Sequence, residues 1–104
     1  MERDRFYMRC CLTGRGKITS NPFDLDRIEW HHNFIYAGKQ VQEKWCILPV
    51  MKRLHDLMVG ETKERCDWIM LNRATDAELA KFDRVDLFTR REQLNKKYGV
   101  WREK

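Results

Sequence analysis

The chain has 104 residues, of which 42% are hydrophobic and 36% are charged. This length is typical of one domain built around one core, so residues 1–104 are expected to form a single domain. The composition differs from that of disordered and membrane proteins, and no apolar run approaches the roughly 18 residues that a membrane span requires. The charged N-terminus does not lead into a signal-type apolar segment, so we expect a soluble, cytoplasmic protein without a membrane partner.

Net charge and cysteine content bear on the possible binding partners, disulfides and metal sites of the chain. The formal net charge of +5 permits an anionic partner such as nucleic acid, although a solvated basic surface is an equal alternative. No C-x-x-C pair is present among the cysteines, and secreted disulfide scaffolds carry denser cysteine patterns. We therefore expect reduced, mostly buried thiols, while a zinc site that uses two of them stays open. The four cysteines are Cys10, Cys11, Cys46 and Cys66.

Short apolar and aromatic runs predict β-strands in the first half of the chain. Residues 5–12 are rich in such side chains and end at a glycine-containing turn. Residues 27–32 begin with the charged–apolar alternation of a half-buried strand. After a loop, residues 41–48 are expected to form a further strand, which Pro49 ends.

Helical spacing of apolar residues dominates the second half. Helices are predicted over 50–58, over 63–71, from Thr75 onward and over 85–98. Thr75 and Glu78 form a capping box, in which each side chain accepts a hydrogen bond from a free backbone N–H of the other residue. Gly60 and Gly99 are expected to end the first and last of these helices. The fold class is therefore α+β, with a helical C-terminal extension over about 62–99.

The three histidines are the best candidates for chemistry. His31 and His32 are adjacent at the end of a predicted strand, and His55 lies on a predicted helix. Neutral imidazole binds divalent metals, and a titratable imidazole can act as a general base near neutral pH. A single histidine is more often a structural residue than a ligand. Nearby carboxylates can complete a metal site, orient the rings or simply be solvated; they belong to Asp24, Asp26, Glu29 and Asp56.

The order of strand, His-His pair, loop, second strand and His-bearing helix resembles the HNH endonucleases and their ββα-metal motif. The resemblance is carried by Ile28-Glu29-Trp30-His31-His32, by Trp45-Cys46-Ile47-Leu48-Pro49 and by Leu54-His55. It covers about residues 10–58, and the segments 69–76 and 97–99 look similar to small phage-encoded HNH-like proteins. The implied fold is a ββα-metal core of hairpin and helix, followed by two or three C-terminal helices. The implied setting is the cytoplasm of a bacterial or phage-infected host cell.

The resemblance implies a metal-dependent endonuclease that hydrolyses phosphodiester bonds of DNA. His31 and His55 match the metal ligands of the family, and His32 matches the general base. The family usually carries an Asn at the start of the second strand, where this chain has Cys46, and Asn33 is the candidate catalytic residue to substitute for it. The implied cofactor is one divalent cation, magnesium or manganese, with zinc also compatible with imidazole ligands.

Departures from the family pattern keep an alternative open. Many members carry two pairs of zinc-binding cysteines, but Met51 and Leu54 stand where the second pair would be, so no structural zinc is expected. The alternative is a non-catalytic module that binds nucleic acid or protein on a degenerate HNH fold. A homodimer or a protein partner is compatible with either function.

Basic and aromatic residues provide candidate contacts with DNA. Phosphate contacts are predicted for Lys39, Arg90, Arg91, Lys96 and Lys97. The alternative for those that lie in the last predicted helix is a solvated helix face. Trp30 and Trp45 are expected to form a cross-strand pair, with core packing favoured over base stacking.

Overall fold

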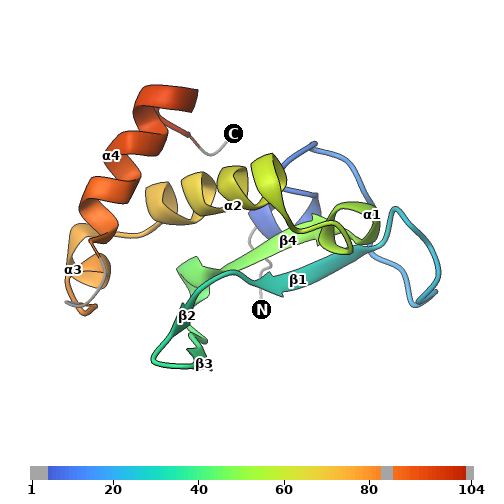
Figure 1. Cartoon of the computed structure of the whole chain (residues 1–104). Coiled ribbons are helices and arrows are strands. Elements are labelled where there is room, and N and C mark those ends of the chain that lie inside the picture. The colour runs from blue at the N-terminus through green and yellow to red at the C-terminus, as the bar shows by residue number, and fades with distance from the viewer. Residues whose placement is uncertain (1–4, 83–85, 103–104) are drawn as a thin grey trace.

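The computed structural model describes residues 5–82 and 86–102. Within these residues the chain has an α+β fold with two small antiparallel sheets and four α-helices (Figure 1). The elements are η1 (Arg5–Met8), β1 (Ile28–His32), β2 (Ile35–Tyr36), β3 (Lys39–Gln40), η2 (Lys44–Cys46), β4 (Ile47–Met51), α1 (Lys52–His55), α2 (Gly60–Arg73), α3 (Asp76–Leu79) and α4 (Leu87–Tyr98).

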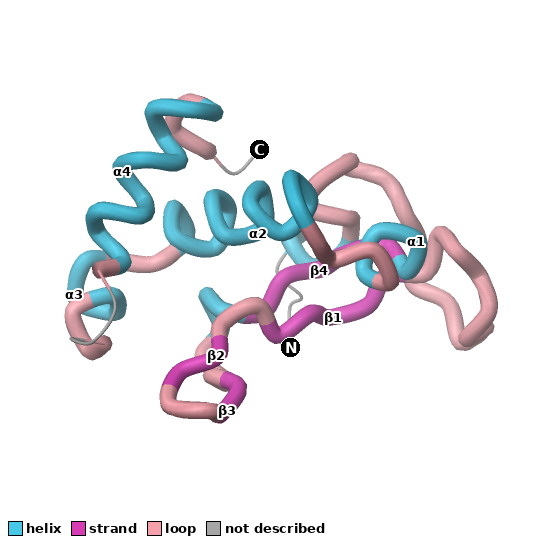
Figure 2. Tube along the Cα trace, in the orientation of Figure 1, coloured by secondary structure: helices cyan, strands magenta, loops and turns pink. Residues whose placement is uncertain are grey.

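The central hairpin pairs β1 with β4, and the small sheet of β2 and β3 projects from one end of it (Figure 2). The register places Ile28 opposite Met51 and His32 opposite Ile47. The strand predicted over 27–32 is therefore confirmed within one residue. Its partner differs from the prediction, because β4 begins only at Ile47 and continues through Pro49.

Pro49 is tolerated in β4 because of the side on which its missing N–H falls. The N and O atoms of one strand residue point to the same side of an antiparallel strand. The carbonyl oxygen of Pro49 accepts a hydrogen bond from Cys11 N at 2.9 Å, outside the β1 ladder. The absent donor consequently lies away from β1 and breaks no bond of the hairpin.

The strand predicted over 5–12 is wrong. Arg5–Met8 forms the 3-10 helix η1, and Cys10 N donates to Arg15 O at 2.7 Å to close a turn. Cys10 is buried, and Phe6 and Leu12 pack against the core, so this segment is held by side-chain burial where we expected strand pairing. An apolar run of this length does not distinguish the two arrangements.

The helix predicted over 50–58 is also largely wrong, because residues 50 and 51 pair with β1. Only Lys52–His55 form α1. Two backbone bonds tie this short helix to the segment before β1: Lys52 N donates to Arg27 O at 2.9 Å, and Arg53 N donates to Leu25 O at 3.2 Å. Gly60, expected to end the helix, is instead the first residue of α2.

The remaining helices agree better with prediction. Cys66, Ile69 and Met70 of α2 are buried, as their spacing indicates, and the capping box at Thr75 opens α3. Helix α4 ends at Tyr98, and Gly99 follows with a φ of 87°. The predicted start of that helix at 85 lies outside the described residues.

Trp30 and Trp45 do not form the expected pair. Trp30 lies opposite Pro49 and is 44% exposed, whereas Trp45 is 3% exposed. Trp45 instead joins an aromatic cluster with Phe34 and Phe82, at centroid distances of 5.9 and 6.0 Å. The two tryptophans separate because Trp45 belongs to η2, ahead of the strand.

Across the described segments, every helix is either too short or too polar to cross a lipid bilayer.

Candidate histidine site

His31 and His55 are brought together by the hairpin and the short helix that follows it. His31 lies near the end of β1, and His55 is the last residue of α1. Their ring centroids are 5.0 Å apart, with the ring planes at 61°. Both side chains are partly buried. Two residues separated by 24 positions in sequence thus share one small region of the surface.

The hydrogen bond between His31 and Asn33 fixes which nitrogen of His31 carries the proton. Nε2 of His31 lies 2.9 Å from Oδ1 of Asn33. The orientation of the Asn33 amide is itself determined, since its Nδ2 donates to Asp67 at 2.9 Å and its Oδ1 accepts from Lys63 at 3.0 Å. An amide oxygen only accepts, so Nε2 of His31 must donate, and Nδ1 is the unprotonated nitrogen of the neutral ring.

Glu29 has the same effect on His55 through the other ring nitrogen. Nδ1 of His55 lies 2.9 Å from Oε1 of Glu29, so Nδ1 donates and Nε2 is the unprotonated nitrogen of the neutral ring. Glu29 and His31 are two residues apart on β1, so they share one face of the hairpin. A carboxylate that holds a histidine in this way is a common outer partner of metal ligands in proteins.

His32 follows His31 on the strand, and its side chain therefore points to the opposite face. Its Nε2 lies 3.1 Å from Oε1 of Gln42, an exposed residue. Because Oε1 accepts, His32 carries its proton on Nε2 and leaves Nδ1 able to accept another. Across residues 5–82 and 86–102, His32 makes no ring contact or hydrogen bond with His31 or His55.

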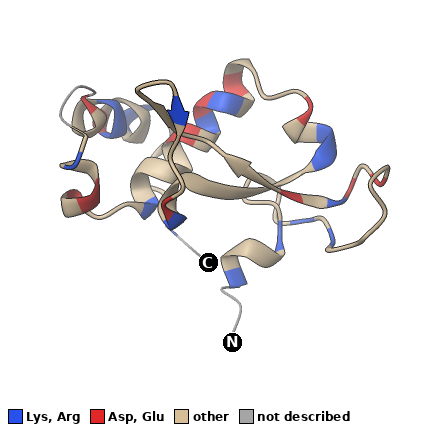
Figure 3. Ribbon diagram, turned by 90° about the horizontal axis from the view of Figure 1, so that it is seen from below, with Lys and Arg blue, Asp and Glu red and all other residues tan. Residues whose placement is uncertain are grey.

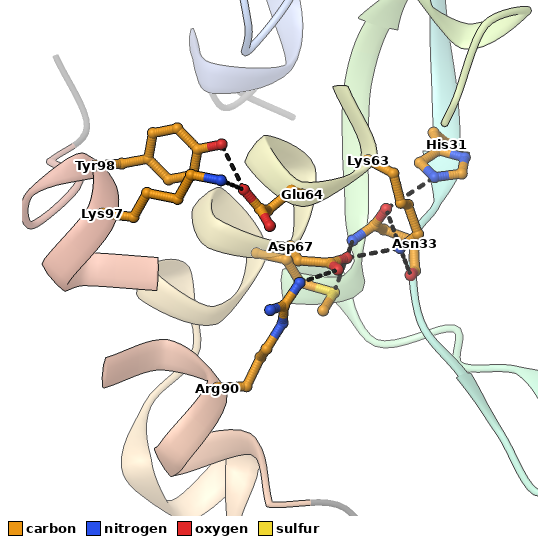
Figure 4. A network of polar contacts seen from close by, with 9 residues as sticks. His31, Asn33, Lys63, Glu64, Asp67, Arg90, Lys97 and Tyr98 are labelled. Carbon is orange, nitrogen blue, oxygen red and sulfur yellow. Dashed lines mark hydrogen bonds and ion pairs between the residues drawn. The ribbon is translucent and has the colours of Figure 1, made fainter. Parts of the chain in front are cut away.

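Beneath His31 lies a polar network that the sequence analysis missed (Figure 4). Nζ of Lys63 donates to Asp67 at 2.6 Å and to both the backbone and side-chain oxygens of Asn33. Arg90 of α4 reaches Asp67 at 3.5 Å. The sequence analysis could have found one part of this network, because Lys63 and Asp67 lie four residues apart on α2, a spacing that favours an ion pair. Nothing in the sequence indicated that Asn33 would join it.

Asn33 lies between this network and the histidines, and it is only 5% exposed. Its backbone N–H donates to Cys46 O at 2.9 Å. Cys46, which stands where the HNH family usually has Asn, is buried, and its burial raises its thiol pKa to about 12. The side chain of Cys46 is therefore a neutral part of the core, while the amide beside His31 comes from Asn33.

The surroundings of His31 lower its pKa and so favour its neutral form. Partial burial lowers its pKa, and the positive charges of a protonated His55 and of Lys63 lower it further, while the bond to Asn33 opposes the shift. A neutral His31 can offer a lone pair to a cation at a pH where an ordinary histidine is partly protonated.

His31 and His55 by themselves do not make a metal site, because further ligands would be needed. In the described part of the chain, no group of three or more His, Cys, Asp or Glu side chains is arranged to hold a metal ion. The nitrogens left free to bind a cation are His31 Nδ1 and His55 Nε2, since each ring holds its proton on the opposite nitrogen. Water or phosphate oxygens would complete such a site.

The basic residues predicted to contact DNA differ in how they are paired. Blue and red segments are interleaved along the helices (Figure 3). Arg91 pairs with Asp76 at 3.0 Å, and Lys97 pairs with Glu64 at 2.6 Å. Arg90 is the partner of Asp67 described above. Lys39 on β3 and Lys96 on α4 are exposed, with no carboxylate partner among the described residues.

Comparison of the chain with protein-family models, with curated proteins and with solved structures finds no match.

Proposed function

We propose that this chain is a divalent-cation-dependent endonuclease of the HNH type that hydrolyses phosphodiester bonds in DNA. The observation that supports this most is the 5.0 Å approach of the His31 and His55 rings, one from the end of a strand and one from the helix after the hairpin. This is the order of elements in the ββα-metal motif that the sequence resembles.

In this proposal His31 Nδ1 and His55 Nε2 hold the cation. Asn33 and Glu29 act as positioning residues, because each accepts a hydrogen bond from the opposite nitrogen of one ring and so fixes its tautomer. When bound, a cation such as Mg²⁺ or Mn²⁺ would stabilise negative charge on the phosphate oxygens.

The resemblance assigns the general base of the proposal to His32, which contacts neither of the proposed metal ligands among the described residues. Gln42 holds the proton on Nε2, so Nδ1 can take a proton from the attacking water. Lys39 on the adjacent small sheet has no carboxylate partner among the described residues, and it is the best placed of the predicted phosphate contacts. The paired arginines and lysine of α4 would have to leave their carboxylates to contact DNA, so we assign them a smaller part.

The test combines cutting with direct metal binding by the full chain. Wild-type protein should nick supercoiled plasmid in Mg²⁺ or Mn²⁺ and bind Mn²⁺ in calorimetry without DNA. His32→Ala should lose cutting and keep Mn²⁺ binding, whereas His31→Ala and His55→Ala should lose both. Asp56→Ala is the matched control, since it alters an exposed neighbour of His55 that pairs with Lys52, and it should keep both.

Two results would overturn the proposal. If wild-type protein binds no divalent cation, the metal-dependent reaction has no basis. If His32→Ala cuts as fast as wild type, the assigned base is wrong or the activity is a contaminant. A protein that shifts DNA in a gel but never cuts it would instead favour the non-catalytic binding module.

A further inference from the structure

A cavity that is separate from the histidines lies against α2. Its volume is about 630 Å³, within the range of small-molecule sites. It is formed by η1 and the turn after it, by one side of α2 and by the residues that follow α4. None of His31, His32, Asn33 or His55 lines it, so the proposed nuclease site does not explain it.

Four arginines line this cavity: Arg5, Arg9, Arg65 and Arg102. Among the described residues that line it, none is an aspartate or a glutamate. The four guanidinium groups have no carboxylate within 4.0 Å in the part of the chain that the structure describes. Arg9 donates a hydrogen bond to the backbone oxygen of Met8. Unpaired cations around one hollow repel each other, and a bound anion would relieve that repulsion.

Cations elsewhere in the described chain are more often paired with a carboxylate. Many of them have a carboxylate within 4.0 Å, including Lys17, Lys52, Arg53, Lys63, Lys81, Arg90, Arg91 and Lys97. Carboxylates are therefore plentiful on this surface. Arg27, Lys39 and Lys96 also lack one among the described residues, so the distinctive feature of the cavity is the clustering of four unpaired arginines around one hollow. It indicates a site for an anion rather than a generally basic protein.

Aromatic rings form the other part of the wall, and the fold holds them in place. Trp68 donates from Nε1 to Gly99 O at 2.7 Å, and its ring centroid is 5.4 Å from that of Tyr98. The Tyr98 hydroxyl donates to Glu64 at 2.6 Å. Trp101 packs edge-on against Phe6 at 5.8 Å. Because the polar atoms of Trp68 and Tyr98 are hydrogen-bonded within the protein and Trp101 packs against Phe6, these rings offer preorganised apolar surfaces to a planar ligand.

We propose that this cavity binds a nucleotide, with the base against the tryptophan and tyrosine rings and the phosphate held by the arginines. Guanidinium groups bind phosphate in bidentate fashion, and nucleobases stack on aromatic side chains. The nucleotide is either free or part of a single strand, since both present the same base and phosphate. In the second case the cavity would also hold a strand of the substrate of the proposed nuclease, and that extension alone rests on the proposed function.

The test uses the full chain in EDTA at fixed salt, so that its outcome does not depend on metal or cutting. Titrations follow tryptophan fluorescence and calorimetry with deoxyadenosine 5′-monophosphate, deoxyadenosine, inorganic phosphate and a four-residue deoxyadenosine oligonucleotide. The monophosphate should bind at least about tenfold more tightly than either the nucleoside or phosphate alone. An oligonucleotide that binds at least about tenfold more tightly than the monophosphate supports a strand, and equal affinity supports a free nucleotide.

Variants locate the binding. Arg65→Ala and Arg102→Ala should each weaken monophosphate binding by about tenfold, because a charge-assisted contact is lost. The Arg102 side chain is exposed, so its variant should leave the fold intact. The control is Arg27→Ala, which removes a cation that also lacks a carboxylate partner among the described residues but lies outside the cavity. Equal weakening by all three variants, or no binding by wild type, would overturn the proposal.

Discussion

Replacing Asn33 with alanine should destabilise the fold and loosen the histidine site together. The Asn33 side chain is buried and uses its whole hydrogen-bonding capacity, donating to Asp67 and to the sulfur of Met70 and accepting from Lys63 and His31. Two of these bonds involve charged groups and one involves a neutral ring. The Lys63–Asp67 pair survives the change, which limits the loss, so we expect a decrease in unfolding free energy of about 2–4 kcal/mol.

Urea denaturation measures this loss, and ¹⁵N NMR of the imidazole measures its effect on His31. In Asn33→Ala the Nε2–H tautomer of His31 should no longer dominate, and Mn²⁺ affinity should fall about 10–100-fold, as it does when outer partners of metal ligands are removed. Asn72→Ala is a matched control, because Asn72 also lies in a hydrogen-bonded cluster, with Trp68 and Asn95. It should lower stability and leave Mn²⁺ binding unchanged. An Asn33→Ala protein with less than about 0.5 kcal/mol of destabilisation and an unaltered His31 tautomer would refute the reasoning.

Four further outcomes follow from particular contacts. Gly16→Ala should lower the free energy of unfolding in urea by about 1–3 kcal/mol more than Gly14→Ala does. Both glycines have positive φ, but only at Gly16 would a Cβ overlap Ile28 Cδ1, so equal losses would contradict this reasoning. Thr75→Ala should lower stability by about 1 kcal/mol and Thr75→Ser by much less, since serine also caps; similar losses would argue against the capping box. Folding lowers the pKa of His31, so between the folded and unfolded pKa values the unfolded chain binds more protons than the folded one. The contribution of His31 to folding stability is therefore present above pH about 6.5 and is lost as pH falls through the lower folded pKa. Urea titrations at several pH values should show that part of the slope missing in His31→Gln. Iodoacetamide at pH 8 should modify Cys46 only after unfolding, because this thiol is buried with a pKa of about 12, and rapid labelling of native protein would contradict it.

Elements whose evidence lies within a few neighbouring residues could be predicted from the sequence. The alternation that predicted β1, the capping box at Thr75 and the glycine after α4 all act over less than two helical turns, and the structure contains each of them. Buried positions on α2 were also correct, because helical spacing alone identifies the inward face.

Elements that depend on distant partners could not be predicted in this way. Pro49 normally ends a strand, yet here its missing donor faces away from β1, which only the register reveals. Residues 50 and 51 fit a helical spacing, but pairing with β1 overrides it. Phe6 in η1 is apolar without lying in a strand, because its side chain packs against the core and its segment pairs with no described strand.

The sequence indicated which histidines to consider, but it did not indicate the side chains that hydrogen-bond to them. The order of the three histidines indicated which of them to consider, and the structure places His31 beside His55. It does not bring His32 into contact with them. The tautomers depend on Asn33 and Glu29, whose alignment with the rings follows from strand register and from the approach of α2.

The four-residue length of α1 determines which substitutions would displace His55. An isolated helical turn does not persist in water, so His55 owes its location to the strand ladder and to the carbonyls of Leu25 and Arg27 that anchor the turn. Substitutions that distort the backbone ahead of β1 would therefore displace His55, although no imidazole lies in that segment, whereas a change that keeps the backbone in place would not. A survey of loss-of-function variants should accordingly find hits around residues 25–27 as well as at the histidines.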